Sequence, residues 1–128
     1  MKRSIIPDTN IFLRFILKDV PSQARIAKKL FRDAEAGKIN IFVPQIIIFE
    51  IQFILNKYYL LSRKLVAEKL EKIVLAPFYF VQDRQSLLAA IGIYREKNIS
   101  FVDSFLKAIC ENKNFKLLSF DKFDDLGG

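Results

Sequence analysis

The chain of 128 residues contains no histidine, a single cysteine, four glycines and four prolines. Without histidine, a Ser-His or Cys-His nucleophile and a histidine-rich zinc site are excluded. The lone Cys110 excludes a thiolate zinc cage and an internal disulfide, and this is typical of a reducing compartment. Carboxylates, hydroxyls, amides and lysine are the groups left for catalysis.

The sequence also lacks an apolar run long enough to cross a membrane. Its most apolar stretch, residues 46–55, contains Glu50 and Gln52 and is far shorter than the roughly 20 residues that a spanning helix needs. Pro7 and Asp8 interrupt the apolar N-terminal run too early for a signal peptide. We therefore expect a cytoplasmic protein with a single domain over residues 1–128, since compact domains commonly have about 100–150 residues.

The balance of charge is strongly basic. Lysine and arginine number 21 against 14 acids, which gives a formal net charge of +7, while 52% of the residues are hydrophobic. The apolar fraction is sufficient for a folded core and excludes a disordered chain. The positive charge favours an anionic partner, of which nucleic acid is the most common, although it also serves solubility.

Apolar periodicity and the positions of proline, serine and glycine predict an alternation of strands and helices. We expect strands at residues 4–8, 39–43, 78–81 and 116–120, and helices at residues 10–17, 21–36, 44–58, 62–75, 85–97 and 100–112. Strands that alternate with helices predict an α/β fold, with a parallel sheet and helices on both of its faces.

Four acids stand among apolar neighbours, where an ionised carboxylate is costly unless it is compensated: Asp8, Glu50, Asp103 and Asp121. Asp8 and Asp121 end predicted strands, the place where ligand sites form in open parallel sheets. A helix cap for Asp8 and a turn for Asp121 are the structural alternatives. Asp103 also fits a capping box that begins at Ser100.

Glu50 is the most informative of the four. Its predicted helix has a polar stripe of Gln45, Gln52 and Asn56, and Glu50 lies about 200° around the helix from Gln52 at 3.6 residues per turn. The face of the helix that carries Glu50 is apolar, with Ile46, Ile47, Phe53 and Ile54. This position predicts that Glu50 is not an ordinary solvated glutamate.

Together the four carboxylates come from separate segments that can meet at one edge of the sheet. Like charges in such a cluster require a cation, and oxygen ligands without histidine or cysteine indicate Mg²⁺ or Mn²⁺. With these four acids set aside, 21 basic residues against ten acids leave +11 on the remaining chain. A metal-filled acidic site in a basic surface is typical of an enzyme that cleaves phosphodiester bonds.

These motifs resemble a PIN domain, over residues 5–126. The similarity lies in Asp8-Thr9-Asn10 with Arg14, in Val-Pro before the helix of Glu50, in Ser-Phe-Val-Asp103 and in Leu-Leu-Ser-Phe-Asp121. The order and size of the segments are most similar to VapC-type toxins of toxin–antitoxin pairs. The resemblance implies a three-layer α/β/α sandwich with a central, mostly parallel sheet, and a Mg²⁺- or Mn²⁺-dependent ribonuclease acting on single-stranded RNA.

The resemblance also implies a set of site residues and partners. It assigns Asp8, Glu50, Asp103 and Asp121 to the catalytic metal site, and the hydroxyls and amide of Thr9, Asn10 and Ser119 to supporting hydrogen bonds. Arg14 is expected near a substrate phosphate. Family members usually have threonine where Ser119 stands, a departure that keeps the hydroxyl. The expected protein partners are a cognate antitoxin and a second copy of the chain, bound through the helices around residues 46–55 and 65–75.

Other classes of protein remain to be weighed. A haloacid-dehalogenase-type phosphatase needs a second aspartate where Asn10 stands. A response-regulator receiver needs an acidic pair after the first strand and a phosphoacceptor aspartate at the end of the third strand. The sequence fits neither. A non-catalytic PIN-like protein that binds RNA or acts as a scaffold, and a housekeeping RNA-processing PIN nuclease, are the alternatives that stay open.

Overall fold

Helices and strands alternate along the chain in a computed structural model that describes residues 2–120. The order is β1 (Arg3–Ile5), α1 (Thr9–Leu17), α2 (Pro21–Glu35), β2 (Ile39–Val43), α3 (Gln45–Lys57), α4 (Arg63–Leu75), β3 (Tyr79–Val81), α5 (Arg84–Glu96) and α6 (Phe101–Lys113). Within the described part, the predicted helices and the first three predicted strands are confirmed, to within a few residues at their ends.

Local capping explains where several helices begin. The side chain of Ser62 accepts a hydrogen bond from the backbone N–H of Leu65, and Ser100 accepts one from the N–H of Asp103. Pro21 opens α2, where its missing N–H costs nothing because the first helical N–H groups have no partner within the helix. The same residues predicted these helix starts from the sequence, because capping interactions join residues that are close in the chain.

The three strands form a parallel sheet in the order β1-β2-β3, which confirms the α/β class. Ile5 pairs with Ile41, and Ile41 pairs with Tyr79. β1 ends three residues before Asp8, earlier than predicted, because Pro7 has no N–H to donate to a ladder. The two crossover connections, from β1 to β2 and from β2 to β3, run in the same direction along the sheet. Since such connections are right-handed, they place their helices on the same face.

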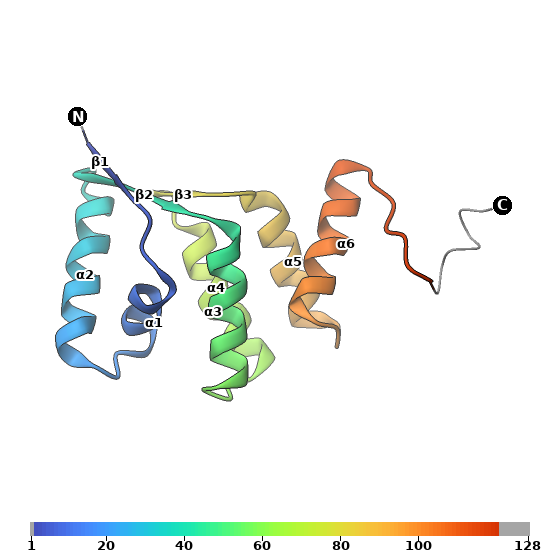
Figure 1. Cartoon of the computed structure of the whole chain (residues 1–128), viewed down its shortest axis with the longest axis horizontal. Coiled ribbons are helices and arrows are strands. Elements are labelled where there is room, and N and C mark those ends of the chain that lie inside the picture. The colour runs from blue at the N-terminus through green and yellow to red at the C-terminus, as the bar shows by residue number, and fades with distance from the viewer. Residues whose placement is uncertain (1, 121–128) are drawn as a thin grey trace.

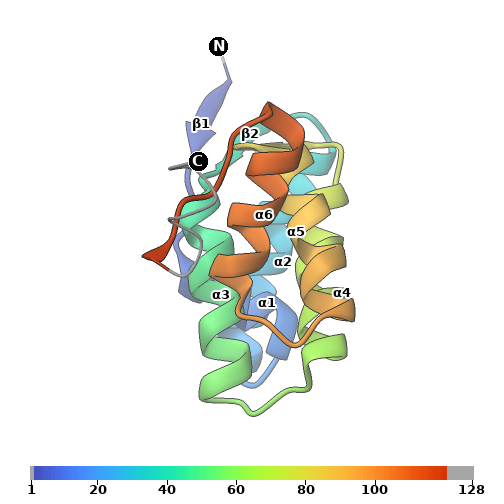
Figure 2. The ribbon, with the colours of Figure 1, turned by 90° about the vertical axis from the view of Figure 1, so that its right-hand side faces the viewer.

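The described helices lie on one side of the sheet (Figures 1 and 2). Ile41 and Val43 point toward them and are fully buried, whereas Phe42 and its cross-strand neighbour Phe80, which is 61% exposed, point to the other side. The second helical layer of a three-layer sandwich therefore does not cover this face within residues 2–120. The parallel sheet and its helix pairs agree with the prediction, and this open face differs from it.

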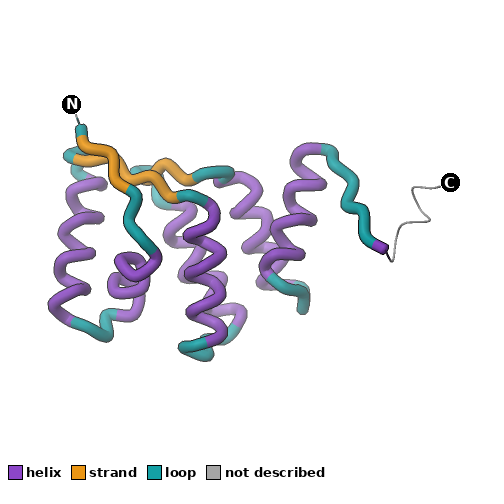
Figure 3. The backbone as a smooth tube through the Cα atoms, viewed as in Figure 1, coloured by secondary structure: helices purple, strands orange, loops and turns teal. Residues whose placement is uncertain are grey.

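The predicted strand at residues 116–120 is wrong. Asn114 ends α6 in the left-handed conformation, and residues 115–119 then run on without regular structure, leading away from the sheet (Figure 3). Phe120 is 96% exposed. A short apolar segment forms a strand only where a neighbouring backbone completes its ladder, and this segment has no such neighbour among residues 2–120. Since residues 2–120 place no strand on the other side of β1, no crossover within this range returns over the second face.

The core lies between the sheet and the helices and within the helical layer. Phe12 stacks on Phe31 with ring centroids 5.2 Å apart, next to Tyr79. A second aromatic group holds α6 on α3, because Phe49 packs edge-on against Phe101 and Phe105 at 5.0 Å. No helix between residues 2 and 120 is long and apolar enough to cross a bilayer.

Candidate active site

Thr9 and Glu50 connect the start of α1 to the second turn of α3. Thr9 is buried directly after β1 and its connecting loop, and its hydroxyl donates a hydrogen bond to Oε1 of Glu50. α3 begins at the carboxyl end of β2, so both residues lie at the sheet edge where the loops after the strands gather. This bond fixes the orientation of the Glu50 carboxylate against Thr9, the residue that follows Asp8.

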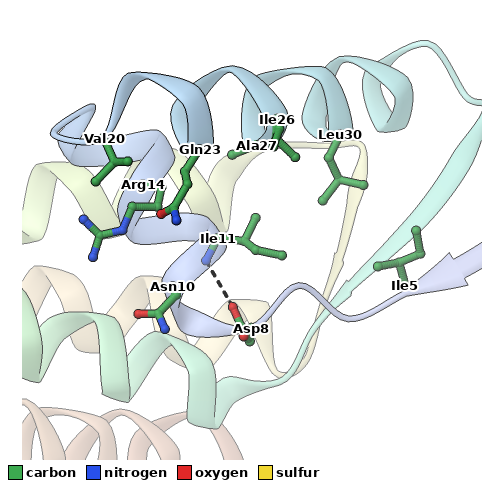
Figure 4. A pocket seen from close by; sticks show the side chains of 10 residues that line it. All are labelled: Ile5, Asp8, Asn10, Ile11, Arg14, Val20, Gln23, Ile26, Ala27 and Leu30. Carbon is green, nitrogen blue, oxygen red and sulfur yellow. Dashed lines mark hydrogen bonds between the residues drawn. The ribbon is translucent and has the colours of Figure 1, made fainter.

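Asp8 caps α1 and also faces a cavity. Its Oδ1 accepts a hydrogen bond from the N–H of Ile11 at 3.1 Å, while the residue remains exposed. The cavity, of about 730 Å³, has polar side chains at one end, where Asp8, Asn10 and Arg14 lie (Figure 4). Its remaining lining is mostly apolar: Ile5, Ile11, Val20, Gln23, Ile26, Ala27 and Leu30. The predicted helix cap and an open carboxylate therefore coexist in Asp8.

The expectation that Glu50 is withdrawn from solvent is wrong. Glu50 does share its face of α3 with apolar residues, but this face is open: Ile46 is 66% exposed and Phe53 is 52% exposed. α3 buries a different face, through Ile48, Ile51 and Leu55. The carboxylate is consequently free to take a ligand without the cost of burying a charge.

Arg14 lines the cavity but is already paired. Its Nη1 lies 2.6 Å from both carboxylate oxygens of Asp19, and this hydrogen bonding raises the pKa of Arg14 and lowers the pKa of Asp19. The hydroxyl of Tyr59 donates to the same carboxylate at 3.5 Å. A substrate phosphate at Arg14 would have to share the guanidinium with Asp19, or displace it.

The other predicted site residues do not lie with Asp8, Thr9 and Glu50 in the described part of the chain. Asp103 is exposed in the first turn of α6, a helix that packs on α3 through the contact of Phe101 with Phe49. Ser119 is exposed in the segment after α6, and Asp121 lies outside the described residues. Among residues 2–120, no three acids are spaced to hold a metal ion together.

The donor chemistry still fits a hard divalent cation. Mg²⁺ is typically held by one or two carboxylates, with waters and substrate phosphates as the other ligands. Asp8 and Glu50 supply two such carboxylates: Asp8 precedes Thr9 in the chain, and the Thr9 hydroxyl donates a hydrogen bond to Glu50. The absence of histidine and of further cysteines excludes the softer ligand sets.

Sequence reasoning missed the α2 wall of the cavity and the partner of Arg14. Ile26 is an apolar residue off the buried stripe of Ala27, Phe31 and Ala34, and this irregularity was a signal that it lines a surface feature. Asp19 gave no such signal. Its approach to Arg14 depends on the left-handed turn at Lys18, which periodicity does not reveal.

Comparisons with known proteins agree with the motif resemblance at the level of the family. A family model described as PIN domain matches residues 5–124. No match is found among curated proteins or among solved structures.

Proposed function

Because the chain belongs to the PIN-domain family, we propose that it is a divalent-metal-dependent endoribonuclease that hydrolyses single-stranded RNA. PIN domains are generally nucleases and typically bind divalent metal ions. The observation that supports the proposal most is the link from Thr9 to Glu50, which ties a second carboxylate to the residue after Asp8 at the carboxyl edge of the sheet. The net charge of +7 suits a polyanionic substrate.

In this proposal, Asp8 and Glu50 hold Mg²⁺ or Mn²⁺, and Asp103 and Asp121 complete the catalytic set. A bound ion of this kind activates water and stabilises charge on the phosphoryl oxygens. Each side chain has its own task. The N–H of Ile11 holds one oxygen of Asp8 in place, which leaves the other oxygen for a ligand. Thr9 orients Glu50, and the amide of Asn10 is placed to bond a water or a phosphate oxygen. Ser119 is the remaining proposed hydroxyl.

Arg14 binds a phosphate of the substrate in this scheme, outside the chemical step. Its guanidinium uses only Nη1 toward Asp19, which leaves further N–H groups for a phosphate oxygen. Because arginine stays charged at any working pH, the contact holds the strand throughout the reaction.

We further propose the role of a toxin in a toxin–antitoxin pair, as a homodimer that a cognate antitoxin inhibits. The part of the expected dimer surface that is open is the α3 face of Ile46 and Phe53, continued by the exposed Tyr58 and Leu60. On α4, by contrast, Val66, Ala67, Leu70 and Val74 are fully buried within the protomer. We therefore restrict the proposed dimer surface to α3.

A cleavage assay on single-stranded RNA tests the proposed activity. Asp8→Asn and Glu50→Gln should each nearly abolish cleavage, and chelation should do the same to the parent protein until Mn²⁺ is added. Glu68→Gln is the matched control, because Glu68 is an exposed acid of α4 away from the cavity. Full activity of Asp8→Asn, or cleavage that survives exhaustive chelation, would overturn the proposal.

A second candidate is a PIN-like protein that binds RNA without cleaving it. The observation that favours it is that residues 2–120 bring no three acids into one group. The same assay separates the two, because a binding protein holds RNA in the presence of Mn²⁺ and returns it intact.

A further inference from the structure

A small cleft with a basic rim lies on the other side of α1 from the candidate active site. Ile11 and Arg14 face the cavity that contains Asp8, whereas Phe12 and Phe15 face this cleft, between α1 and α4. Its volume is about 200 Å³. The floor is aromatic, and Lys18, Lys69 and Lys72 stand around it.

The three lysines form a concentrated positive charge. Lys18 follows α1 in the left-handed conformation, and Lys69 and Lys72 lie one turn apart on α4. None of the three makes an ion pair with an acid between residues 2 and 120, although four other basic side chains there do. Their charges are therefore available to a ligand from outside the chain.

Tyr79 supplies a hydroxyl donor at the floor of the cleft. The residue is only 7% exposed, and its hydroxyl forms no hydrogen bond with another group within residues 2–120, although it is not among the fully buried polar atoms that lack a partner. Burial, together with the charge of Glu35, raises the pKa of Tyr79 to about 12, so the group stays protonated at neutral pH. The hydroxyl is therefore a donor that an acceptor entering the cleft could bond.

We propose that this cleft is a second RNA-contact site, which holds one nucleotide of the strand with its phosphate on Lys18, Lys69, Lys72 and the Tyr79 hydroxyl. This inference rests on the proposed function. A cleft of this volume is too small for a helix of a protein partner, and positively charged side chains that follow the backbone are typical of single-stranded nucleic-acid sites. Asp8 and Lys18 flank α1, whose nine residues span about 14 Å, so one strand can reach both sites.

The test is RNA binding measured without turnover. Affinities for a labelled single-stranded RNA oligomer are measured in chelator over a range of salt concentrations, for Lys69→Gln/Lys72→Gln and for the control Lys64→Gln/Lys107→Gln, which removes the same charge elsewhere. The cleft variant should bind about tenfold more weakly, with a log–log salt slope smaller by about 1.4, since each contact to a single strand contributes about 0.7. The control should stay within about twofold of the parent.

Tyr79→Phe provides a second variant that keeps the ring and removes only the donor. It should weaken RNA binding while the melting temperature stays near that of the parent. Equal affinity losses in the cleft variant and the control would overturn the inference, because net charge alone would then explain binding. The inference would also be overturned if inorganic phosphate or a mononucleotide saturates the cleft while the cleft variant binds RNA as well as the parent. The cleft would then be a site for small anions.

The outcomes separate this inference from the proposed function. A protein that binds RNA through the cleft and cleaves nothing would contradict the nuclease proposal and leave the cleft in place. A metal-dependent nuclease whose cleft variant binds RNA as well as the control would contradict the cleft alone.

Discussion

The hydroxyl of Thr9 donates a hydrogen bond to the carboxylate of Glu50, 41 residues further along the chain. The donor is buried and the acceptor is exposed, so the protein fixes one end of the carboxylate while the other end stays open. Such an arrangement orients a ligand more than it stabilises a fold, because a single bond of this kind contributes only about 0.5–1.5 kcal/mol.

Thr9→Val should therefore reduce RNA cleavage at saturating Mn²⁺ by about tenfold or more, the effect typical of losing a residue that orients a metal ligand. The free energy of unfolding should fall by only about 1 kcal/mol. Thr9→Ser, which keeps the donor, should restore cleavage. Cleavage at the parent rate in Thr9→Val would show that Glu50 needs no orientation by Thr9.

Asp8 has two roles that substitution can separate. Asparagine caps a helix about as well as aspartate, so Asp8→Asn should unfold in denaturant at nearly the same midpoint as the parent. Asp8→Ala should lose about 0.5–2 kcal/mol, because the N–H of Ile11 loses its acceptor. Both variants should fail to cleave RNA. An Asp8→Asn variant that is unstable as well as inactive would contradict this separation.

Binding of a divalent ion should raise the stability of the folded chain. At a Mn²⁺ concentration 100 times the dissociation constant, the gain is about 2.7 kcal/mol, which corresponds to a rise in melting temperature of roughly 5–20 °C. Thermal melts with Mn²⁺ and with chelator should show this rise in the parent and in Glu68→Gln, and not in Glu50→Gln. A parent whose melting is indifferent to Mn²⁺ would argue against a metal site.

The pairing of Arg14 with Asp19 should compete with substrate. Asp19→Asn removes the charge that holds the guanidinium, so RNA affinity measured in chelator should rise by about two- to fivefold, as for a modest change in a surface ion pair. Arg14→Gln should weaken binding. If Asp19→Asn leaves RNA affinity unchanged, Arg14 does not contact the phosphate backbone.

The sequence was sufficient where structure depends on local interactions. Ser62, Ser100 and Pro21 mark helix starts through groups within the same turn, and residues 39–43 form a strand as predicted. It was insufficient at residues 116–120, where a short apolar segment cannot indicate whether a neighbouring backbone completes the ladder.

Glu50 shows a similar limit at the candidate site. Periodicity correctly placed it on the same face as Ile46 and Phe53, but the choice of which face of α3 packs inward depends on tertiary contacts. The link to Thr9 and the pairing of Arg14 with Asp19 are also tertiary or turn-dependent, so neither could be read from spacing.

Tyr79 predicts a specific loss of stability at alkaline pH. Its pKa is raised to about 12 in the folded protein, mainly by burial and secondarily by Glu35, from an ordinary value of 10.0. Between these values the folded state binds more protons than the unfolded state, so this contribution to stability is complete below pH 10 and is lost as the pH rises toward 12. Tyr79→Phe has no proton to lose. Its free energy of unfolding, measured by denaturant titration at several pH values, should therefore decline less steeply than that of the parent over this window. Since all other tyrosines and lysines are common to both proteins, identical slopes would show that the Tyr79 hydroxyl titrates as freely in the folded protein as in the unfolded chain.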